Sequence, residues 1–277
     1  DSNGDGVSSG AAADWRGLSY GNPANVLHDA VLRYGGRYSL NGTGQADDAL
    51  VYLGGSAGTL EVRDCVLEYS SDFGIYAEAN QTPWIHNTTI RNCGNSAVRL
   101  QGGGTIENNT ITGNSTGVEL YGVATVEANA ITGNSYGVRN RGTGNPTIQN
   151  NTISGNTYGV DFGPGEPVYA GNTVSNANRV IMVDGGTLGQ NVTWADYGMP
   201  YLISSDLTIP ASRTLTIQPG VVVKFNGNRT ISVNGTLQLN STAAQKVVFT
   251  SYRDDQYGGD SNGDGVSSGA AADWRGL

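Results

Sequence analysis

A period of 20 to 22 residues in the middle of the chain constrains the fold more than any other feature. Three consecutive segments show it best, at 105–120, 125–140 and 147–162, and looser copies lie at 84–100 and 168–183. Each copy has three short runs of apolar and polar residues, separated by Gly, Asn and Ser. No stretch shows the 3.6-residue period of a helix. The pattern predicts three short β-strands in every repeat.

A single repeat of this kind has one apolar stripe and cannot bury it alone. Stacking the repeats ~4.8 Å apart closes an apolar interior and gives every strand two hydrogen-bonding neighbours. We therefore expect an all-β parallel β-helix, a solenoid of about ten coils of ~20–22 residues with loop insertions. The expected inward columns are Ile106, Val126, Ile148 and Val168; Ile111, Ile131, Ile153 and Val174; and Val118, Val138, Val160 and Ile181.

Asparagines recur at two fixed positions of the repeat. Asn tolerates left-handed backbone at corners, and its amide can bond the same amide in the coils on either side. The Asn-Gly pairs could instead mark hairpin turns of an antiparallel meander, but a meander does not need one residue type at constant spacing. The expected ladders are Asn109, Asn129, Asn151 and Asn172, and Asn114, Asn134 and Asn156.

The first eighteen residues, 1–18, are repeated without change at 260–277. A small duplicated module would drift, so we favour one unit of a tandem array with a period of 259 residues, the offset between residues 1 and 260. We expect 1–193 to be the main body of one unit and 194–277 to form the opening coils of the next. Together they would make one continuous solenoid, whose exposed ends are covered by identical units.

The motif NNTI-x-GN-x-x-GV between residues 84 and 183 resembles the right-handed parallel β-helix repeats of large bacterial surface proteins and of pectate-lyase-like and NosD-like proteins. Residues 25–36 and 61–71 carry a looser version, and 200–255 are similar to the usual opening coils of such domains. The resemblance implies a right-handed coil and a secreted location at the bacterial cell surface.

Composition excludes several classes of function. Only 14% of the residues are charged and the net charge is -9, without a basic patch that would bind nucleic acid. No apolar run reaches the roughly 18 residues that a membrane-spanning helix needs. Cys65 and Cys93 fall in different columns of the repeat, so two buried thiols are favoured over a disulfide.

The duplicated segment opens with DSNGDG, which matches the first half of a calcium-binding loop. Such loops place oxygen ligands at alternate positions and then a Gly for a sharp turn. The twelfth position, normally Glu, is Ala here, and a Gly-rich acidic turn without metal is the alternative. The candidate Ca²⁺ ligands are Asp1, Asn3, Asp5 and Asp14 in the first copy, and Asp254, Asp255, Asp260, Asn262, Asp264 and Asp273 around the second.

No set of residues marks a catalytic centre, and we expect no enzyme. Arg99, Glu119, Arg139 and Asp161 alternate in sign in one column, which predicts ion pairs between coils on a solvated face. The chain is therefore expected to be a structural unit of an extracellular filament or adhesin stalk, with identical units as partners. The alternative is a β-helix that binds or cleaves surface polysaccharide, with Glu107, Glu127, Tyr136 and Tyr158 as sugar contacts.

Overall fold

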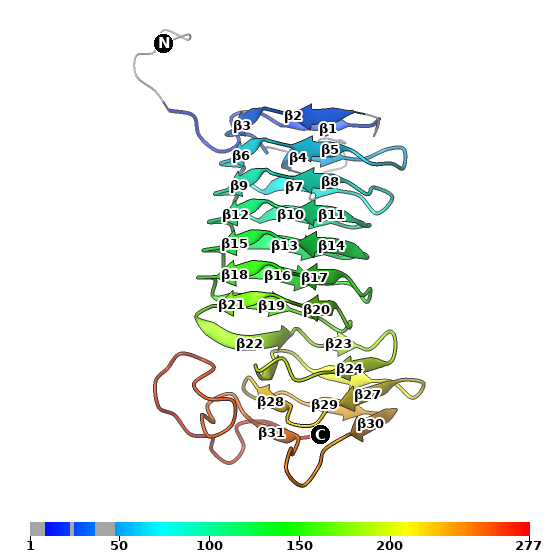
Figure 1. Ribbon diagram of the computed structural model, residues 1–277, viewed down its shortest axis with the longest axis vertical. Coiled ribbons are helices and arrows are strands. Elements are labelled where there is room, and N and C mark those ends of the chain that lie inside the picture. Colours follow the sequence, from blue (N-terminus) through cyan, green and yellow to red (C-terminus); the bar gives the residue numbers. More distant parts are fainter. Residues whose placement is uncertain (1–8, 23–24, 37–47) are drawn as a thin grey trace.

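The computed structural model describes residues 9–22, 25–36 and 48–277. All regular elements in these ranges are short parallel β-strands, stacked as a solenoid whose coils lie one above another (Figure 1). The predicted fold class is therefore confirmed.

Every coil visits three faces in the same order. The first face is sheet A, which has eleven strands and runs the whole length of the described solenoid. Its strands are β1 (Leu18–Tyr20), β4 (Ala49–Leu53), β7 (Phe73–Ala77), β10 (Ser96–Leu100), β13 (Thr116–Leu120), β16 (Tyr136–Asn140), β19 (Tyr158–Asp161), β22 (Asn178–Val183), β25 (Tyr201–Ile203), β28 (Val222–Phe225) and β31 (Val248–Ser251).

The second face begins as a seven-stranded sheet and continues, farther along the chain, as a three-stranded one. The seven strands are β2 (Val26–His28), β5 (Glu61–Arg63), β8 (Trp84–His86), β11 (Gly104–Glu107), β14 (Ala124–Glu127), β17 (Thr147–Gln149) and β20 (Val168–Ala170). The three are β23 (Gly186–Thr187), β26 (Leu207–Ile209) and β29 (Ile231–Val233).

The third face is divided in the same way. Its first part holds β3 (Val31–Arg33), β6 (Val66–Glu68), β9 (Thr89–Arg91), β12 (Thr110–Thr112), β15 (Ala130–Thr132), β18 (Thr152–Ser154) and β21 (Thr173–Ser175). Its second part holds β24 (Val192–Trp194), β27 (Thr214–Ile217) and β30 (Thr236–Leu239). Sheet A passes the expected boundary at residues 193 and 194 without a break.

Alternation along each strand builds the core. Ile106, Val126 and Ile148 are in register on neighbouring strands and are fully buried. The expected fourth member of that column, Val168, is wrong: it is 55% exposed, and Tyr169 pairs with Ile148. The predicted alignment was one residue out at β20, so it placed an outward-facing residue in the inward column. The other two columns are in register as predicted.

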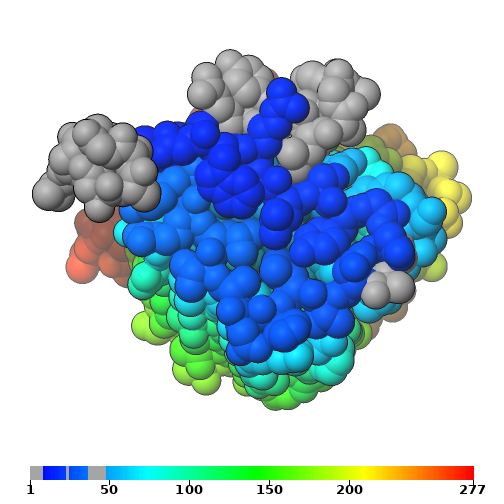
Figure 2. Space-filling model, turned by 90° about the horizontal axis from the view of Figure 1, so that it is seen from above, coloured from blue at the N-terminus to red at the C-terminus, as the bar shows by residue number. Residues whose placement is uncertain are grey.

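The N-terminal end of the stack is seen in Figure 2, where the described residues of the first coil lie across the coils below. Leu27 and Leu32 of this coil are still buried, at 8% and 7% exposure. No helix in the described ranges is long and apolar enough to cross a bilayer.

Candidate functional site

The first asparagine ladder runs along the corner between the second and third faces. The side-chain Oδ1 of Asn129 accepts hydrogen bonds from the backbone N–H of Asn109 at 2.9 Å and from its Nδ2 at 3.0 Å. The same arrangement joins Asn129 to Asn151 and Asn151 to Asn172. Each Nδ2 also donates to a strand carbonyl, such as that of Ile106. These amides satisfy backbone groups that the corner removes from the sheets.

The second ladder lies between the third face and sheet A. Asn114, Asn134 and Asn156 form the predicted column, and Asn176, which the sequence analysis missed, continues it. Cys93 begins this column, because its N–H donates to Asn114 Oδ1 at 2.9 Å. Cys65 and Cys93 are buried free thiols, and burial raises the pKa of Cys93 to about 12.

The predicted reason for asparagine in the ladders was wrong in one respect. The residues with positive φ at the first corner are Asn108, Ala128 and Asn150, each one position before a ladder asparagine. The left-handed residue turns the chain, and the next residue then points its amide into the protein. Ala128 adopts the left-handed conformation although it has no side-chain amide to support it. This conformation costs an alanine roughly 1 kcal/mol.

The expected charge column lies on the outer side of sheet A. Arg99, Glu119, Arg139 and Asp161 are in register on successive strands. Arg139 Nε lies 3.3 Å from Asp161 Oδ2, and Arg99 Nε lies 3.7 Å from Glu119 Oε2. Ion pairs between coils are therefore present, and Arg141 and Asp184 extend them.

This column is less solvated than predicted, because Asp161 is fully buried and Glu119 is 8% exposed. Burial raises the pKa of Asp161 to about 6, although the N–H of Gly163 and the guanidinium of Arg139 both favour its charged form. Arg139 of the preceding coil and the N–H groups of Gly163 and Asp184 contact the carboxylate. The ion pairs thus connect successive coils in a partly buried layer, although burial itself disfavours the charge of Asp161.

The residues proposed for sugar contact occupy two separate surfaces. Glu107 and Glu127 are in register on the second face, where Glu107 Oε1 accepts a hydrogen bond from Trp84 Nε1 at 2.7 Å. Glu127 Oε1 accepts one from Asn150 Nδ2 at 3.1 Å. Tyr136 and Tyr158 stack on sheet A with ring centroids 5.4 Å apart. Both tyrosine rings are half-buried.

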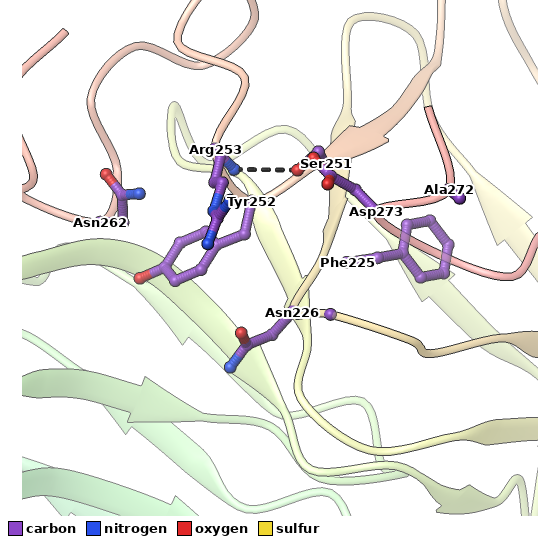
Figure 3. A pocket seen from close by; sticks show the side chains of 9 residues that line it. Phe225, Asn226, Ser251, Tyr252, Arg253, Asn262, Ala272 and Asp273 are labelled. Carbon is purple, nitrogen blue, oxygen red and sulfur yellow. Dashed lines mark hydrogen bonds between the residues drawn. The ribbon is translucent and has the colours of Figure 1, made fainter. Parts of the chain in front are cut away.

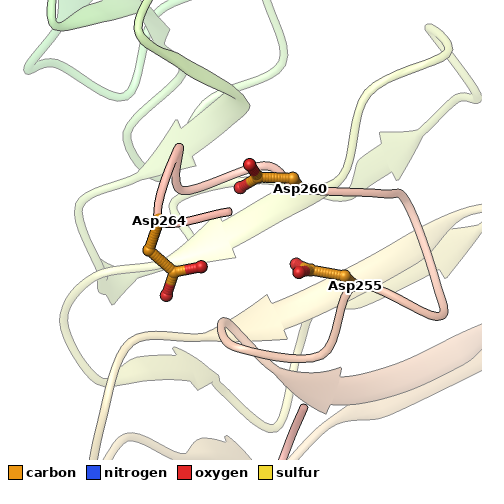
Figure 4. A group of neighbouring side chains, drawn as sticks. All are labelled: Asp255, Asp260 and Asp264. Carbon is orange, nitrogen blue, oxygen red and sulfur yellow. The ribbon is translucent and has the colours of Figure 1, made fainter. Parts of the chain in front are cut away.

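The acidic loop after β31 brings together three of the predicted metal ligands. Single carboxylate oxygens of Asp255, Asp260 and Asp264 lie within 4.8 Å of one another, and Figure 4 shows the three side chains around a common space. Asp260 accepts hydrogen bonds from the N–H groups of Gly263 and Gly265, which fix the tight turn. The Oδ1 of Asp255 is buried and has no hydrogen-bond partner.

The other predicted ligands are placed differently. Asn262 Nδ2 donates to Asp264 Oδ2 at 2.7 Å, beside the cluster. Asp273 accepts from the N–H of Ala270, and Asp14 accepts from that of Ala11 in the equivalent turn of the first copy. Asp254 accepts from the hydroxyl of Thr250. Asp1, Asn3 and Asp5 lie outside the described residues.

Lys224 is an important residue that the sequence analysis missed. It points outward from β28, yet the acidic loop covers it completely, and its Nζ donates to Ser261 Oγ at 2.8 Å and to the carbonyl of Gly259 at 3.0 Å. Burial lowers the pKa of Lys224, while the aspartates of the loop oppose that shift. The lysine thus attaches the loop to the solenoid. A lone Lys in the apolar run of 221–225 was the only signal in the sequence.

The two copies of the duplicated segment are held in different places. In the first copy the segment enters sheet A, since Leu18 in β1 pairs with Val51 in β4. Trp15 packs against the core and donates from Nε1 to the carbonyl of Arg33 at 2.6 Å.

In the second copy the segment lies at the opposite end of the solenoid. Gly276 forms a parallel bridge with Thr230, directly before β29 on the second face. Trp274 stacks on Phe225 with centroids 4.2 Å apart. Phe225 and Asp273 also line the pocket in Figure 3, together with Ser251 and Arg253.

Comparisons with known proteins agree with this geometry. A model of the right-handed beta helix region matches residues 39–125 and 74–251, which together span most of the chain. No curated protein and no solved structure gives a significant match. Since the matched region covers more than half of the sequence and the coordinates form a parallel solenoid, the chain belongs to the right-handed beta helix family.

Proposed function

We propose that this chain is the structural repeat unit of an extracellular bacterial filament or adhesin stalk, in which identical units stack end to end. The observation that carries the proposal is the eighteen-residue sequence repeated at 1–18 and 260–277, of which the described residues contact one end of the solenoid in the first copy and the other end in the second. At each end a Trp-Arg-Gly-Leu sequence contributes a tryptophan to the core. One segment that fits both ends is what a junction between copies requires.

The contacts between successive coils support a mechanical role. Two amide ladders and a layer of ion pairs connect coil to coil along the axis. A parallel solenoid adds nearly equal interfaces with every coil, so its length can grow without a new core. Such a rod resists bending because each coil is hydrogen-bonded to two neighbours on three faces.

The test is the length of chains that contain one, two and three units, the later units beginning at residue 19. Small-angle scattering and electron microscopy should show one rod of constant width, longer by about 50 Å for each added unit, from about ten coils at ~4.8 Å. Separate bodies joined by flexible connections would contradict the proposal.

We also propose that the acidic loop binds Ca²⁺ through Asp255, Asp260 and Asp264. The support is their convergence within 4.8 Å and the buried, unpartnered Oδ1 of Asp255. Titration calorimetry with CaCl₂ should show binding that Asp264→Asn weakens by tenfold or more, whereas Asp29→Asn, a change between β2 and β3 at the opposite end of the solenoid, should leave it unchanged. Absence of heat at millimolar CaCl₂ would refute calcium binding, and equal binding by both variants would refute the assignment of the site to Asp255, Asp260 and Asp264.

Carbohydrate binding is a second candidate, supported by one observation on the second face. Trp84 is 40% exposed, stacks on His86 and lies hydrogen-bonded to Glu107, so an aromatic ring and a carboxylate are adjacent. Sugar rings stack on exposed aromatic side chains of this kind. Binding to a polysaccharide that Trp84→Ala abolishes and Val123→Ala preserves would favour this function.

A further inference from the structure

The identical segment lies on different faces at the two ends of the solenoid. In the first copy Leu18 begins β1, which belongs to sheet A on the first face. In the second copy Gly276 pairs with Thr230, at the start of the β29 strand on the second face. The same residues therefore occupy positions that are one face apart.

The order of the faces makes both placements necessary. After the first copy the chain forms β2 and β3, which occupy the second and third faces, so β1 must lie on the first. Before the second copy the chain completes β31 on the first face, so the next strand must lie on the second. The excursion at 252–273 lies at this corner and does not complete another turn.

We infer that consecutive units, joined as in the function proposed above, share this segment as a single strand and are rotated by one face, about 120°, at every junction. A strand has two edges, and the two copies show the segment using opposite ones. Its preceding edge bonds to Thr230 and Ile231 of one unit, and its following edge bonds to β4 of the next. The second face of one unit thus continues as sheet A of its successor.

The side chains fit both edges with the same orientation. Leu18 is in register with Val51, which is fully buried. The bridge between Gly276 and Thr230 places Leu277 in register with Ile231, which is also fully buried. The following residue, Ser19, points outward, and its counterpart in this register, Ser232, is exposed. A shift of one residue would have reversed this pattern.

The tryptophan of the segment also has a partner on each side. Trp274 stacks on Phe225 of its own unit, with the two rings 6° from parallel. Trp15 lies against Gly35, where an added Cβ would be 2.9 Å from the indole ring. In a junction one indole therefore lies between Phe225 of one unit and the backbone of Gly35 in the next.

The rotation sets the dimensions of the filament. The eleven strands of sheet A are separated by ten steps, and the move to the second face adds one third of a coil. Each unit then contributes about ten and one third coils, or roughly 50 Å at ~4.8 Å per coil. Equivalent surfaces, such as the acidic loop, return to the same side after three units, about 150 Å along the axis, in addition to the gradual twist of the sheets.

A disulfide test in a two-unit chain, residues 1–277 followed by 19–277, separates the alternatives. Ser19→Cys is introduced in the second unit only, where residue 19 directly follows Leu277, and is combined with either Ser232→Cys on β29 or Thr250→Cys on β31 in the first unit. Neighbouring parallel strands are ~4.8 Å apart, within the Cα separation that a disulfide accepts. We expect mild oxidation to close the Ser232 pair in most molecules and to leave the Thr250 pair open. Cys65 and Cys93 are buried, and single-cysteine chains control for intermolecular bonds.

Each other outcome has a distinct meaning. Closure of the Thr250 pair instead would show stacked units without rotation and would overturn this inference while leaving the filament intact. Closure of neither pair in a molecule that scatters as one rod would also overturn it. Closure of neither pair in a molecule that scatters as two separate bodies would refute the stacking itself, and with it the proposed function.

Discussion

Replacing Asn129 by Ala tests the asparagine ladders at their centre. Asn129 is 2% exposed, and its side chain takes part in five hydrogen bonds. It accepts from the N–H and the Nδ2 of Asn109, and donates to the carbonyls of Ile106 and Glu127 and to Asn151 Oδ1. The variant loses all five and leaves the backbone N–H of Asn109 buried without its acceptor.

The size of the effect follows from that geometry. Hydrogen bonds contribute a net ~1 kcal/mol each, and a buried donor without a partner costs about 1–3 kcal/mol. Since some of the carbonyls keep other partners in the sheets, we expect a loss of about 3–5 kcal/mol in the free energy of unfolding. The second variant, Asn129→Asp, keeps the acceptor for Asn109 but directs a carboxylate at three acceptor oxygens. It should be less stable still at pH 7, and recover as the carboxylate is protonated at lower pH.

The assay is urea unfolding followed by circular dichroism, with hydrogen exchange of the coils around residues 106–131 as a local measure. Asn234→Ala is the matched control, because Asn234 is exposed and its change should cost less than about 0.5 kcal/mol. If Asn129→Ala is as stable as Asn234→Ala, the ladder does not hold the coils together and the reasoning is wrong.

Three further predictions concern other parts of the solenoid. Burial raises the pKa of Asp161 to about 6, so the folded state binds the carboxyl proton more tightly than the unfolded state does. This difference stabilises the fold fully below about pH 4 and is lost as the pH rises to 6. Asp161→Asn should remove roughly 2–3 kcal/mol of this pH dependence, measured by denaturation from pH 3.5 to 7. A Cβ at Gly137 would lie 2.4 Å from the carbonyl oxygen of Gly159, so Gly137→Ala should destabilise the protein by about 2 kcal/mol or more, whereas Gly21→Ala, at a site with open space, should be neutral in the same melts. Lys224→Met should release the acidic loop, so that limited proteolysis cuts between residues 252 and 273 much faster than in the unchanged chain, and unchanged cleavage would contradict the role of the lysine.

The sequence was most informative where the chain repeats itself. Between residues 84 and 183 the asparagines and apolar residues recur at fixed spacing, and most predicted columns are in register. The exception, Val168, follows a loop whose length differs from that of its neighbours, and periodicity alone cannot follow such a shift. The burial of Asp161 depends on coils and loops that lie far from it in the sequence.

Two features could not be predicted for a different reason. Lys224 acquires its role only when residues 252–273 fold back over β28, a contact across 35 residues or more of chain. The two copies of the duplicated segment are identical, so nothing within them distinguishes a strand on the first face from one on the second. Their placement is determined by the strands that come before and after.

Helical reconstruction of a filament assembled from many units would show whether the solenoid continues through each junction. We expect strands ~4.8 Å apart through every junction without interruption, with each unit rotated by about 120° and displaced by about 50 Å. A break in the strand spacing every 259 residues, with units free to tilt against one another, would contradict this expectation.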